Sequence, residues 1–340
     1  MKFIAFFGFG LLLLYLVYYN LDQGYQSYCA EEGIASEDCS LANRVANDLL
    51  SANFTWVFVA LSFYMFSNIS RAIQWSLLLE PISHRPKFYN VFLGVMLGYF
   101  TNLGLPRMGE FIRSGAISRY ENIPYEKVFA TVVTSRVLDM VLLGIAAVIA
   151  LIVEADKIMQ FITAYMPGIQ SLLFLVIVGI VGLFVFYWIL TMKSDNAFVQ
   201  KIQHIATGFK DGLLSILKVK KPVTLILHTV FIWVMYVAMT YVGFWAYEPT
   251  AGVSLSAGIV VFVIASLGFV LPSPGGMGTY HALVIISLSF YGIDKLDAFS
   301  YAMILFITLQ IGANVVFGMI SLLLLPKLNE GKEIKMSIPE

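Results

Sequence analysis

The chain has 340 residues, of which 59% are hydrophobic and 12% are charged, and its mean hydropathy is +0.83. A soluble domain typically carries about 25% charged residues, so this chain has too little polar surface for a water-soluble globule. Its formal net charge is zero, which gives no bulk basicity for nucleic-acid binding. Composition therefore predicts an all-α, polytopic membrane protein without a nucleic-acid partner.

Apolar runs extend along the whole chain, and a membrane span needs about 20 such residues. In order, the runs cover residues 3–20, 54–79, 88–104, 127–153, 170–192, 222–247, 254–271, 279–291 and 298–326. The third, seventh and eighth runs are short or broken. No small-residue cleavage site follows the first run, so we expect it to be an uncleaved anchor.

Lysine and arginine predict which loops face the cytoplasm. Basic residues concentrate in the loop 193–221, in the tail after Pro326, and between the second and third runs, at Arg85 and Lys87. The loops 21–53, 154–169 and 292–297 hold one basic residue each. This distribution predicts an inner (plasma) membrane protein with both termini in the cytoplasm.

With this orientation, two segments begin and end on the same side of the membrane. Residues 88–126 begin and end inside, whereas residues 254–291 begin and end outside. Each contains a break rich in proline and glycine, "NLGLPRMGE" in the first and "LPSPGGMG" in the second. Irregular backbone at membrane depth is tolerated only where protein buries it or a wet cavity adjoins it. We therefore expect about six full spans and two re-entrant hairpins with buried tips.

The two halves of the chain follow the same order in opposite orientations. Residues 1–169 give two spans, a hairpin from inside and a span, and residues 170–330 repeat this with the hairpin from outside. Residues 331–340 form a cytoplasmic tail. Inverted repeats with broken helices are typical of secondary transporters, whose substrate site lies at the repeat interface. The alternative is a re-entrant fold used only for packing.

The hairpin tips are the first candidate site. We expect new half-helices to begin near Arg107 and near Gly276, which follows Gly275, and their N-termini to converge as an anion site. Arg107, Glu110 and Arg113 recur at three-residue spacing and would share one helical face. Arginine forks suit phosphate, so this pattern predicts a phosphate-binding site.

Arg136 and Asp139, in "SRVLDM", lie deep in the run 127–153 and are spaced to pair on one helix face. A charge inside a span costs at least about 2.5–3.5 kcal/mol on the insertion scale. The pair could fix the rotation of the helix, or Arg136 could face the same anion while Asp139 orients it. For Asp139 we favour the structural role.

Other polar residues have alternative interpretations. Asn102 would cap freed backbone, which we favour, or touch the substrate, and Arg71 would reach the cytoplasmic interface, which we favour, or contact an acidic headgroup on the entry side. Glu110 would balance Arg107 and Arg113, or would carry a coupling proton. His281 would bond hairpin backbone or titrate near neutral pH.

Two further pairs bear on packing. Gly94 and Gly98 would allow the first hairpin arm to approach a neighbour closely. Cys29 and Cys39 lie in the loop after the first run, and they form either a disulfide, favoured in an oxidising compartment, or two free thiols.

The elements "NLGLPRMGEFIR", "SRVLDM" and "PSPGGMGTYH" together resemble the lysylphosphatidylglycerol synthase transmembrane, flippase-like family over nearly the whole chain. This resemblance implies that, in bifunctional members, a soluble synthetase domain makes aminoacylated phosphatidylglycerol. It implies that the membrane domain then moves this lipid to the outer leaflet. By motif position, Arg107, Glu110, Arg136 and Asp139 match the charged core of the family. Many relatives have an acidic residue where this chain has His281, so the lipid could instead be a glycosylated or polyprenyl-phosphate carrier.

The sequence contains no phosphate loop, H-E-x-x-H, G-x-S-x-G or Cys/His cluster. We therefore expect no cofactor, no metal and no enzymatic activity. The predicted function is translocation of an anionic lipid between leaflets, with the acyl chains remaining in the bilayer. The alternatives are a membrane-embedded enzyme acting on a lipid-linked phosphate or sugar, and a non-catalytic partner of a lipid-synthesising enzyme.

Overall fold

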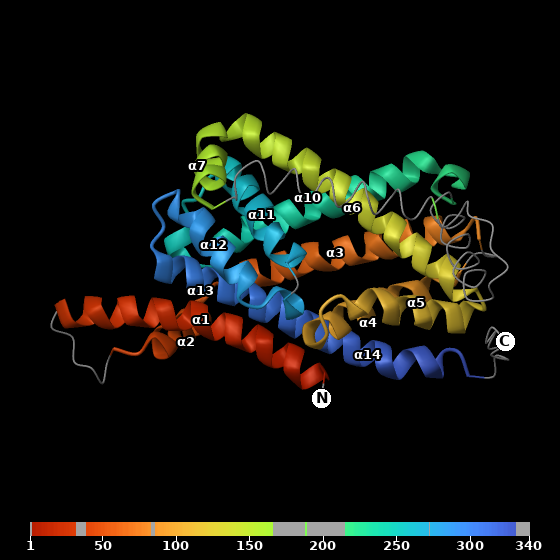
Figure 1. Ribbon diagram of the computed structural model, residues 1–340, viewed down its shortest axis with the longest axis horizontal. Coiled ribbons are helices and arrows are strands. Elements are labelled where there is room, and N and C mark those ends of the chain that lie inside the picture. The colour runs from red at the N-terminus through yellow and green to blue at the C-terminus, as the bar shows by residue number, and fades with distance from the viewer. Residues whose placement is uncertain are drawn as a thin grey trace.

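The structure is a computed structural model that describes residues 2–31, 39–82, 86–165, 188, 215–271 and 273–330. The described residues form helices and connections without a strand, which confirms the predicted all-α class (Figure 1). Arg85, the tail 331–340, the span 170–192 apart from Trp188, and most of the loop 193–221 lie outside the described residues. The division into repeats at residue 170 therefore stays a prediction.

Four described helices are long and apolar enough to cross a membrane, so the chain is a polytopic membrane protein. They are α3 (Phe54–Leu79), α6 (Tyr125–Val153), α10 (Pro222–Phe244) and a continuous helix, Lys295–Lys327. This last helix consists of α13 (Lys295–Leu305), the π-helical segment η4 (Phe306–Ala313) and α14 (Asn314–Lys327). The predicted first span lies within α1 (Lys2–Glu31).

Two helical hairpins stand where the breaks predicted them. In the first, α4 (Phe88–Gly104) turns at 105–107 into α5 (Met108–Glu121). In the second, α11 (Leu255–Val270) continues through the 3₁₀ turn η3 (Pro274–Gly276) into α12 (Thr279–Ser289). The arms have 17, 14, 16 and 11 residues, fewer than the roughly 20 that a span needs.

The arms of each hairpin touch backbone to backbone at a glycine. A Cβ at Gly109 would lie 2.1 Å from the carbonyl oxygen of Gly98, and one at Gly268 would lie 2.7 Å from the Cα of Tyr280. The close approach predicted for Gly98 is therefore confirmed, and the neighbour is the second arm of the same hairpin. Only glycine permits arms this close.

The two tips meet near the middle of the molecule, with the hairpins extending toward opposite ends of its long axis (Figure 1). A Cβ at Gly275 would lie 3.1 Å from the side chain of Leu103, and Arg107 donates a hydrogen bond to the carbonyl oxygen of Val270. The expected start of the second half-helix near Gly276 is wrong. Gly275, Gly276 and Gly278 all have positive φ, so the α-helix begins only at Thr279.

Two segments expected as loops contain helices. The helix α1 continues to Glu31, and α2 (Leu41–Ser51) and α7 (Ala155–Tyr165) follow the first and third spans. Cys29 and Cys39 form the predicted disulfide, which joins the end of α1 to the residue before the N-cap of α2.

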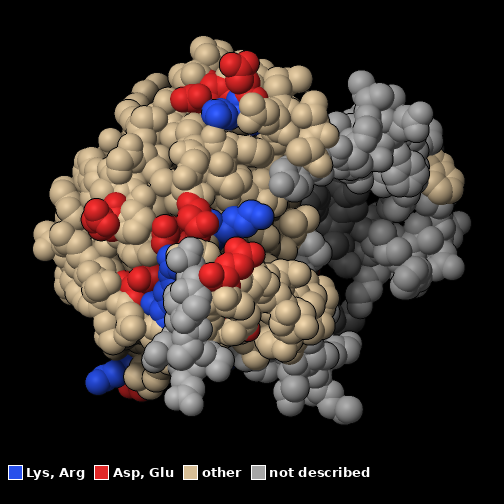
Figure 2. Space-filling view, turned by 90° about the vertical axis from the view of Figure 1, so that its left-hand side faces the viewer, with Lys and Arg blue, Asp and Glu red and all other residues tan. Residues whose placement is uncertain are grey.

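Polar contacts hold α2 against α13, where Arg44 pairs with Asp297 at 2.8 Å and Ser300 donates to Asp48 at 2.6 Å. Figure 2 shows the left-hand end of the molecule in Figure 1, where acidic and basic side chains stand among uncharged ones. The remaining short elements are η1 (Ser215–Lys218) and η2 (Glu248–Thr250).

Candidate functional site

A cavity of about 380 Å³ lies where the hairpin tips meet, between α3, α6, α10, α11 and η4. Seven predicted site residues line it: Asn102, Arg107, Glu110, Arg136, Asp139, Gly275 and Gly276. Arg113 and His281 do not. The lining also includes residues that the sequence analysis did not assign to the site, namely Arg71, Tyr99, Trp233 and Tyr236.

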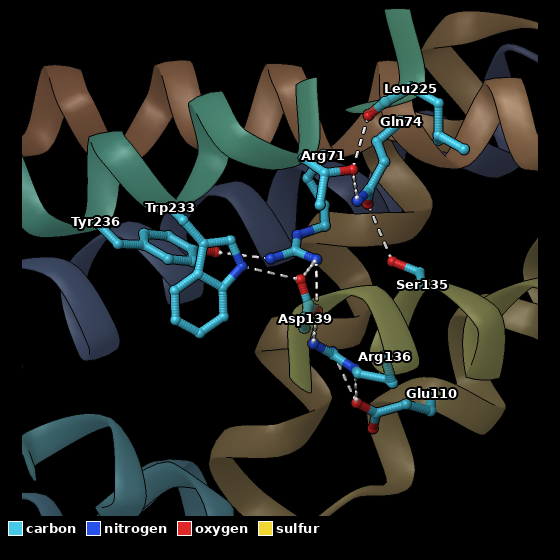
Figure 3. Close-up of polar contacts among 10 residues, drawn as sticks. Arg71, Gln74, Glu110, Ser135, Arg136, Asp139, Leu225, Trp233 and Tyr236 are labelled. Carbon is cyan, nitrogen blue, oxygen red and sulfur yellow. Dashed lines mark hydrogen bonds and ion pairs between the residues drawn. The ribbon is translucent and has the colours of Figure 1, made fainter. Parts of the chain in front are cut away.

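Four charged side chains form a chain of ion pairs along one wall of this cavity (Figure 3). Arg71 of α3 bonds Asp139 of α6 at 2.7 Å, and Asp139 bonds Arg136 at 3.1 Å. Arg136 bonds Glu110 of α5 at 2.8 Å. The predicted pairing of Arg136 with Asp139 on one helix face is confirmed. Further ion pairs connect this pair to the span α3 through Arg71 and to the first hairpin through Glu110.

The structure corrects the expectation for Arg71, whose side chain is 2% exposed and does not reach an interface. Its Nη1 donates to both carboxylate oxygens of Asp139 at 2.7 Å, and its Nη2 lies 3.4 Å from the hydroxyl of Tyr236. Trp233 Nε1 approaches Asp139 at 3.4 Å. An unpaired arginine would be costly here, so the carboxylate of Asp139 is what allows Arg71 to be buried.

A second row of hydrogen bonds joins α3, α6 and α10 beside the ion pairs (Figure 3). Gln74 of α3 donates to Thr229 of α10 at 2.8 Å and accepts from Ser135 of α6 at 3.0 Å. Every one of these groups is buried and partnered. This row holds α3 and α6 in the register that brings Arg71 to Asp139.

The three charged residues of the first tip do not share one helical face as predicted. Arg107 precedes α5 in the left-handed conformation, with φ 61°, and extends across to Val270. Glu110 binds Arg136 and also interacts electrostatically with Arg113, so the structure adds Arg136 to the cations that Glu110 was expected to balance.

Arg113 lies away from the cavity, 2% exposed, with its guanidinium 4.9 Å from the ring centre of Trp75. Its Nε and Nη2 have no hydrogen-bond partner among the described residues. A cation over an indole face is a recognised packing arrangement. The structure therefore places Arg113 in the packing of the first hairpin against α3, which does not fit direct contact with a phosphate in the cavity.

Asn102 has the capping contact that the sequence analysis expected, because its Oδ1 accepts from the backbone N–H of Gly109 at 2.8 Å. Glu110 also occupies the first turn of α5. A cap and a carboxylate at this position already satisfy part of the positive helix end. The positive charge of the cavity therefore comes mainly from arginine side chains.

His281 is fully buried and lies outside the cavity lining. Its ring packs on Phe306 with centroids 4.6 Å apart, and Tyr280 and Phe299 also contact it. Neither ring nitrogen has a hydrogen-bond partner among the described residues, so the expected bond to hairpin backbone is not formed. The structure gives His281 a packing role in the second hairpin.

The charged lining has an excess of positive charge. Among described lining residues, Arg71, Arg107 and Arg136 oppose Glu110 and Asp139, which gives a net charge of +1 (three minus two). No group of His, Cys, Asp or Glu in the described parts of the chain could hold a metal ion. The site is thus suited to an anion held by guanidinium groups.

The protein family described as "Lysylphosphatidylglycerol synthase TM region" matches residues 41–316 of this chain. This range includes both hairpins and all the charged lining residues. The chain belongs to this family. The helix α1 and both cysteines of the disulfide, Cys29 and Cys39, precede the matched range.

Two relatives of this chain have names that describe them as membrane proteins and state no activity. UPF0104 membrane protein MJ1595 of Methanocaldococcus jannaschii is 23% identical over 74% of this chain and 79% of its own length. UPF0104 membrane protein PH1989 of Pyrococcus horikoshii is 23% identical over 77% of this chain and 84% of its own length. No solved structure matches the chain significantly.

Proposed function

We propose that this protein moves an anionic phospholipid, or another lipid-linked phosphate, between the two leaflets of the membrane. The observation that carries the proposal is the net positive cavity at the junction of two hairpin tips. Broken helices that meet at a cavity are typical of transporters, and charges at such depth usually serve function. The name of the family, which refers to a lipid synthase, agrees with a lipid as ligand.

Two arginines have the geometry to bind the phosphate. Arg136 is 33% exposed and lines the cavity, so a phosphate can replace Glu110 as its partner. Arg107 is exposed at the tips and bonds a neutral carbonyl, which leaves its charge available. Arg71 is buried under Asp139, and both residues position Arg136.

The mouth of the cavity suits a lipid that approaches from the bilayer. Met140 of α6 and Phe269, Val270 and Leu271 of the second hairpin line the cavity, yet they are exposed on the surface. An exposed apolar rim around a charged interior fits an amphipathic ligand. We place the protein in the inner (plasma) membrane with both termini in the cytoplasm, on the distribution of lysines and arginines.

Leaflet-resolved transport in proteoliposomes tests this proposal. Fluorescent phosphatidylglycerol placed in one leaflet should relocate unmodified, and Arg136→Ala or Arg107→Ala should slow it about tenfold or more, because each removes charge-assisted hydrogen bonds. Arg119→Ala is the matched control, since Arg119 is exposed on α5, contacts the ring of Tyr120 and does not line the cavity.

The same assay separates the alternatives. Chemical change of the lipid would favour a membrane-embedded enzyme. If the lipid neither relocates nor changes chemically, the remaining alternative is a non-catalytic partner of a lipid-synthesising enzyme. Thermal unfolding of each variant in detergent shows whether a loss of transport reflects a loss of fold.

A further inference from the structure

The cavity continues well beyond the ion pairs, into the space between α10, α11 and the helix formed by α13 and η4. Its lining residues on α11 run from Val261 to Val270, roughly 13 Å along a helix axis at 1.5 Å per residue. On α13 and η4 they run from Tyr301 to Gln310, a similar length. The cavity is therefore elongated, and its charged residues lie on α3, α6 and the first hairpin.

The side of the cavity that α11, α13 and η4 form is apolar. Val261, Phe262, Ala265, Leu305 and Leu309 are buried there. None of the described lining residues from α11 to η4 carries a charge.

Two hydroxyl groups on this side of the cavity already have hydrogen-bond acceptors. Tyr301 donates to the carbonyl of Thr240 at 2.9 Å, and Ser266 donates to the carbonyl of Phe262 at 2.7 Å. Such a surface offers little to a phosphate, and a charged group there would lose its hydration without a partner. A hydrocarbon chain would lose no hydration by moving there from the bilayer, because both surroundings are apolar.

We propose that the cavity takes one hydrocarbon chain of its lipid into the protein, with the phosphate at Arg136 and Arg107 and the chain between α10, α11 and η4. This inference rests on the proposed function for the identity of the ligand as an anionic lipid. It replaces the expectation that both chains remain in the bilayer. A pocket of this size, mostly apolar with a few polar groups on one side, is the usual form of a small-molecule site.

Photocrosslinking locates the chain directly. The probe is phosphatidylglycerol with a diazirine at the end of one acyl chain, present at low fraction in phosphatidylcholine nanodiscs that contain the full chain. We expect crosslinks on Phe262, Ala265, Leu305 or Leu309, and we expect excess unlabelled phosphatidylglycerol to suppress them. Crosslinks confined to outward-facing residues of α6, such as Val141 and Val148, would overturn the inference.

A filled cavity provides the second test. Ala265→Trp should reduce the cavity crosslinks about fivefold or more, because the indole occupies the apolar side. Val148→Trp, on the exposed face of α6 and outside the lining, should leave them unchanged. Equal crosslinking in Ala265→Trp would contradict the inference. If Ala265→Trp does not fold, the crosslinks of the unmodified chain decide.

Transport by the same protein in proteoliposomes distinguishes this inference from the proposed function. Relocation of the lipid with crosslinks only at outward-facing residues would overturn the internal chain site and leave the transport proposal standing. Competed crosslinks in the cavity without relocation would support the chain site and count against transport.

Discussion

The two hairpins share a topology but differ in chemistry. The first carries Arg107, Glu110 and Arg113, and Asn102 caps its second arm. The described residues of the second, in the range 255–289, include no Asp, Glu, Lys or Arg, and three glycines with positive φ form its turn. The comparison indicates that one hairpin supplies charges to the cavity while the other forms an apolar wall.

The surroundings of the two tips differ in the same sense. The helix α1 packs against the second tip. A Cβ at Gly278 of the tip would lie 2.6 Å from Leu13 of α1, and a Cβ at Gly10 of α1 would lie 3.0 Å from Pro274 of the tip. The first tip leaves Arg107 and Met108 exposed. The apolar tip is therefore held in place by packing, and the charged tip remains accessible.

The largest expected effect tests what the hairpins have in common. Gly109→Ala and Gly268→Ala should each destabilise the fold by about 3 kcal/mol or more, since each Cβ would collide with the backbone of the opposite arm. Gly144→Ala is the control, because nothing lies within 4 Å of its added Cβ. Thermal unfolding in detergent measures the difference. Equal stability of all three variants would show that the arms are not in backbone contact.

A second prediction concerns the ion pairs that join the charged hairpin to the spans. Asp139→Ala should lower the free energy of unfolding by about 3–5 kcal/mol, because it leaves Arg71 buried without a carboxylate. Combining it with Arg71→Met should recover part of that loss. A double variant as unstable as the sum of the two single variants would argue against a direct pair.

Glu110→Gln sharpens the contrast by raising the positive charge of the first hairpin. The amide can still accept from Arg136, but its charge no longer competes with a phosphate. We expect binding of phosphatidylglycerol to tighten by roughly threefold to tenfold. Native mass spectrometry of lipid retention measures this, with neutral phosphatidylcholine as the comparison lipid. Weaker binding of the anionic lipid would mean that Glu110 itself contacts the headgroup.

Arg113→Met should have the smallest effect. Arg113 packs on Trp75 and lies outside the lining, so transport should stay within about twofold of the unsubstituted protein. Replacing a poorly bonded buried cation by an apolar side chain of similar length often leaves stability unchanged or slightly raised. A loss of transport as large as that of Arg136→Ala would return Arg113 to the binding site.

Local sequence signals predicted the hairpins and part of the site. The run 54–79 coincides with α3, the proline and glycine breaks mark both tips, and three-residue spacing paired Arg136 with Asp139. The capping role of Asn102 also follows from residue type and position. These features depend on neighbours within a few residues of one another.

The features that were missed depend on distant partners or on weak periodicity. Arg71 pairs with a residue 68 positions later, a contact that spacing along one helix cannot reveal. The helix α2 did have a signal, since Ser40 caps it and Leu41, Val45 and Leu49 repeat every four residues. The signal for α7 was weaker, because its two buried residues, Ile158 and Phe161, are a single pair at three-residue spacing.

A cryo-EM map of the protein in nanodiscs that contain phosphatidylglycerol tests the central claim most directly. We predict phosphate density within hydrogen-bond distance of Arg136 and Arg107, between two hairpin tips in contact. Tips that lie apart, or a cavity without phosphate density while anionic lipid is bound elsewhere, would contradict it.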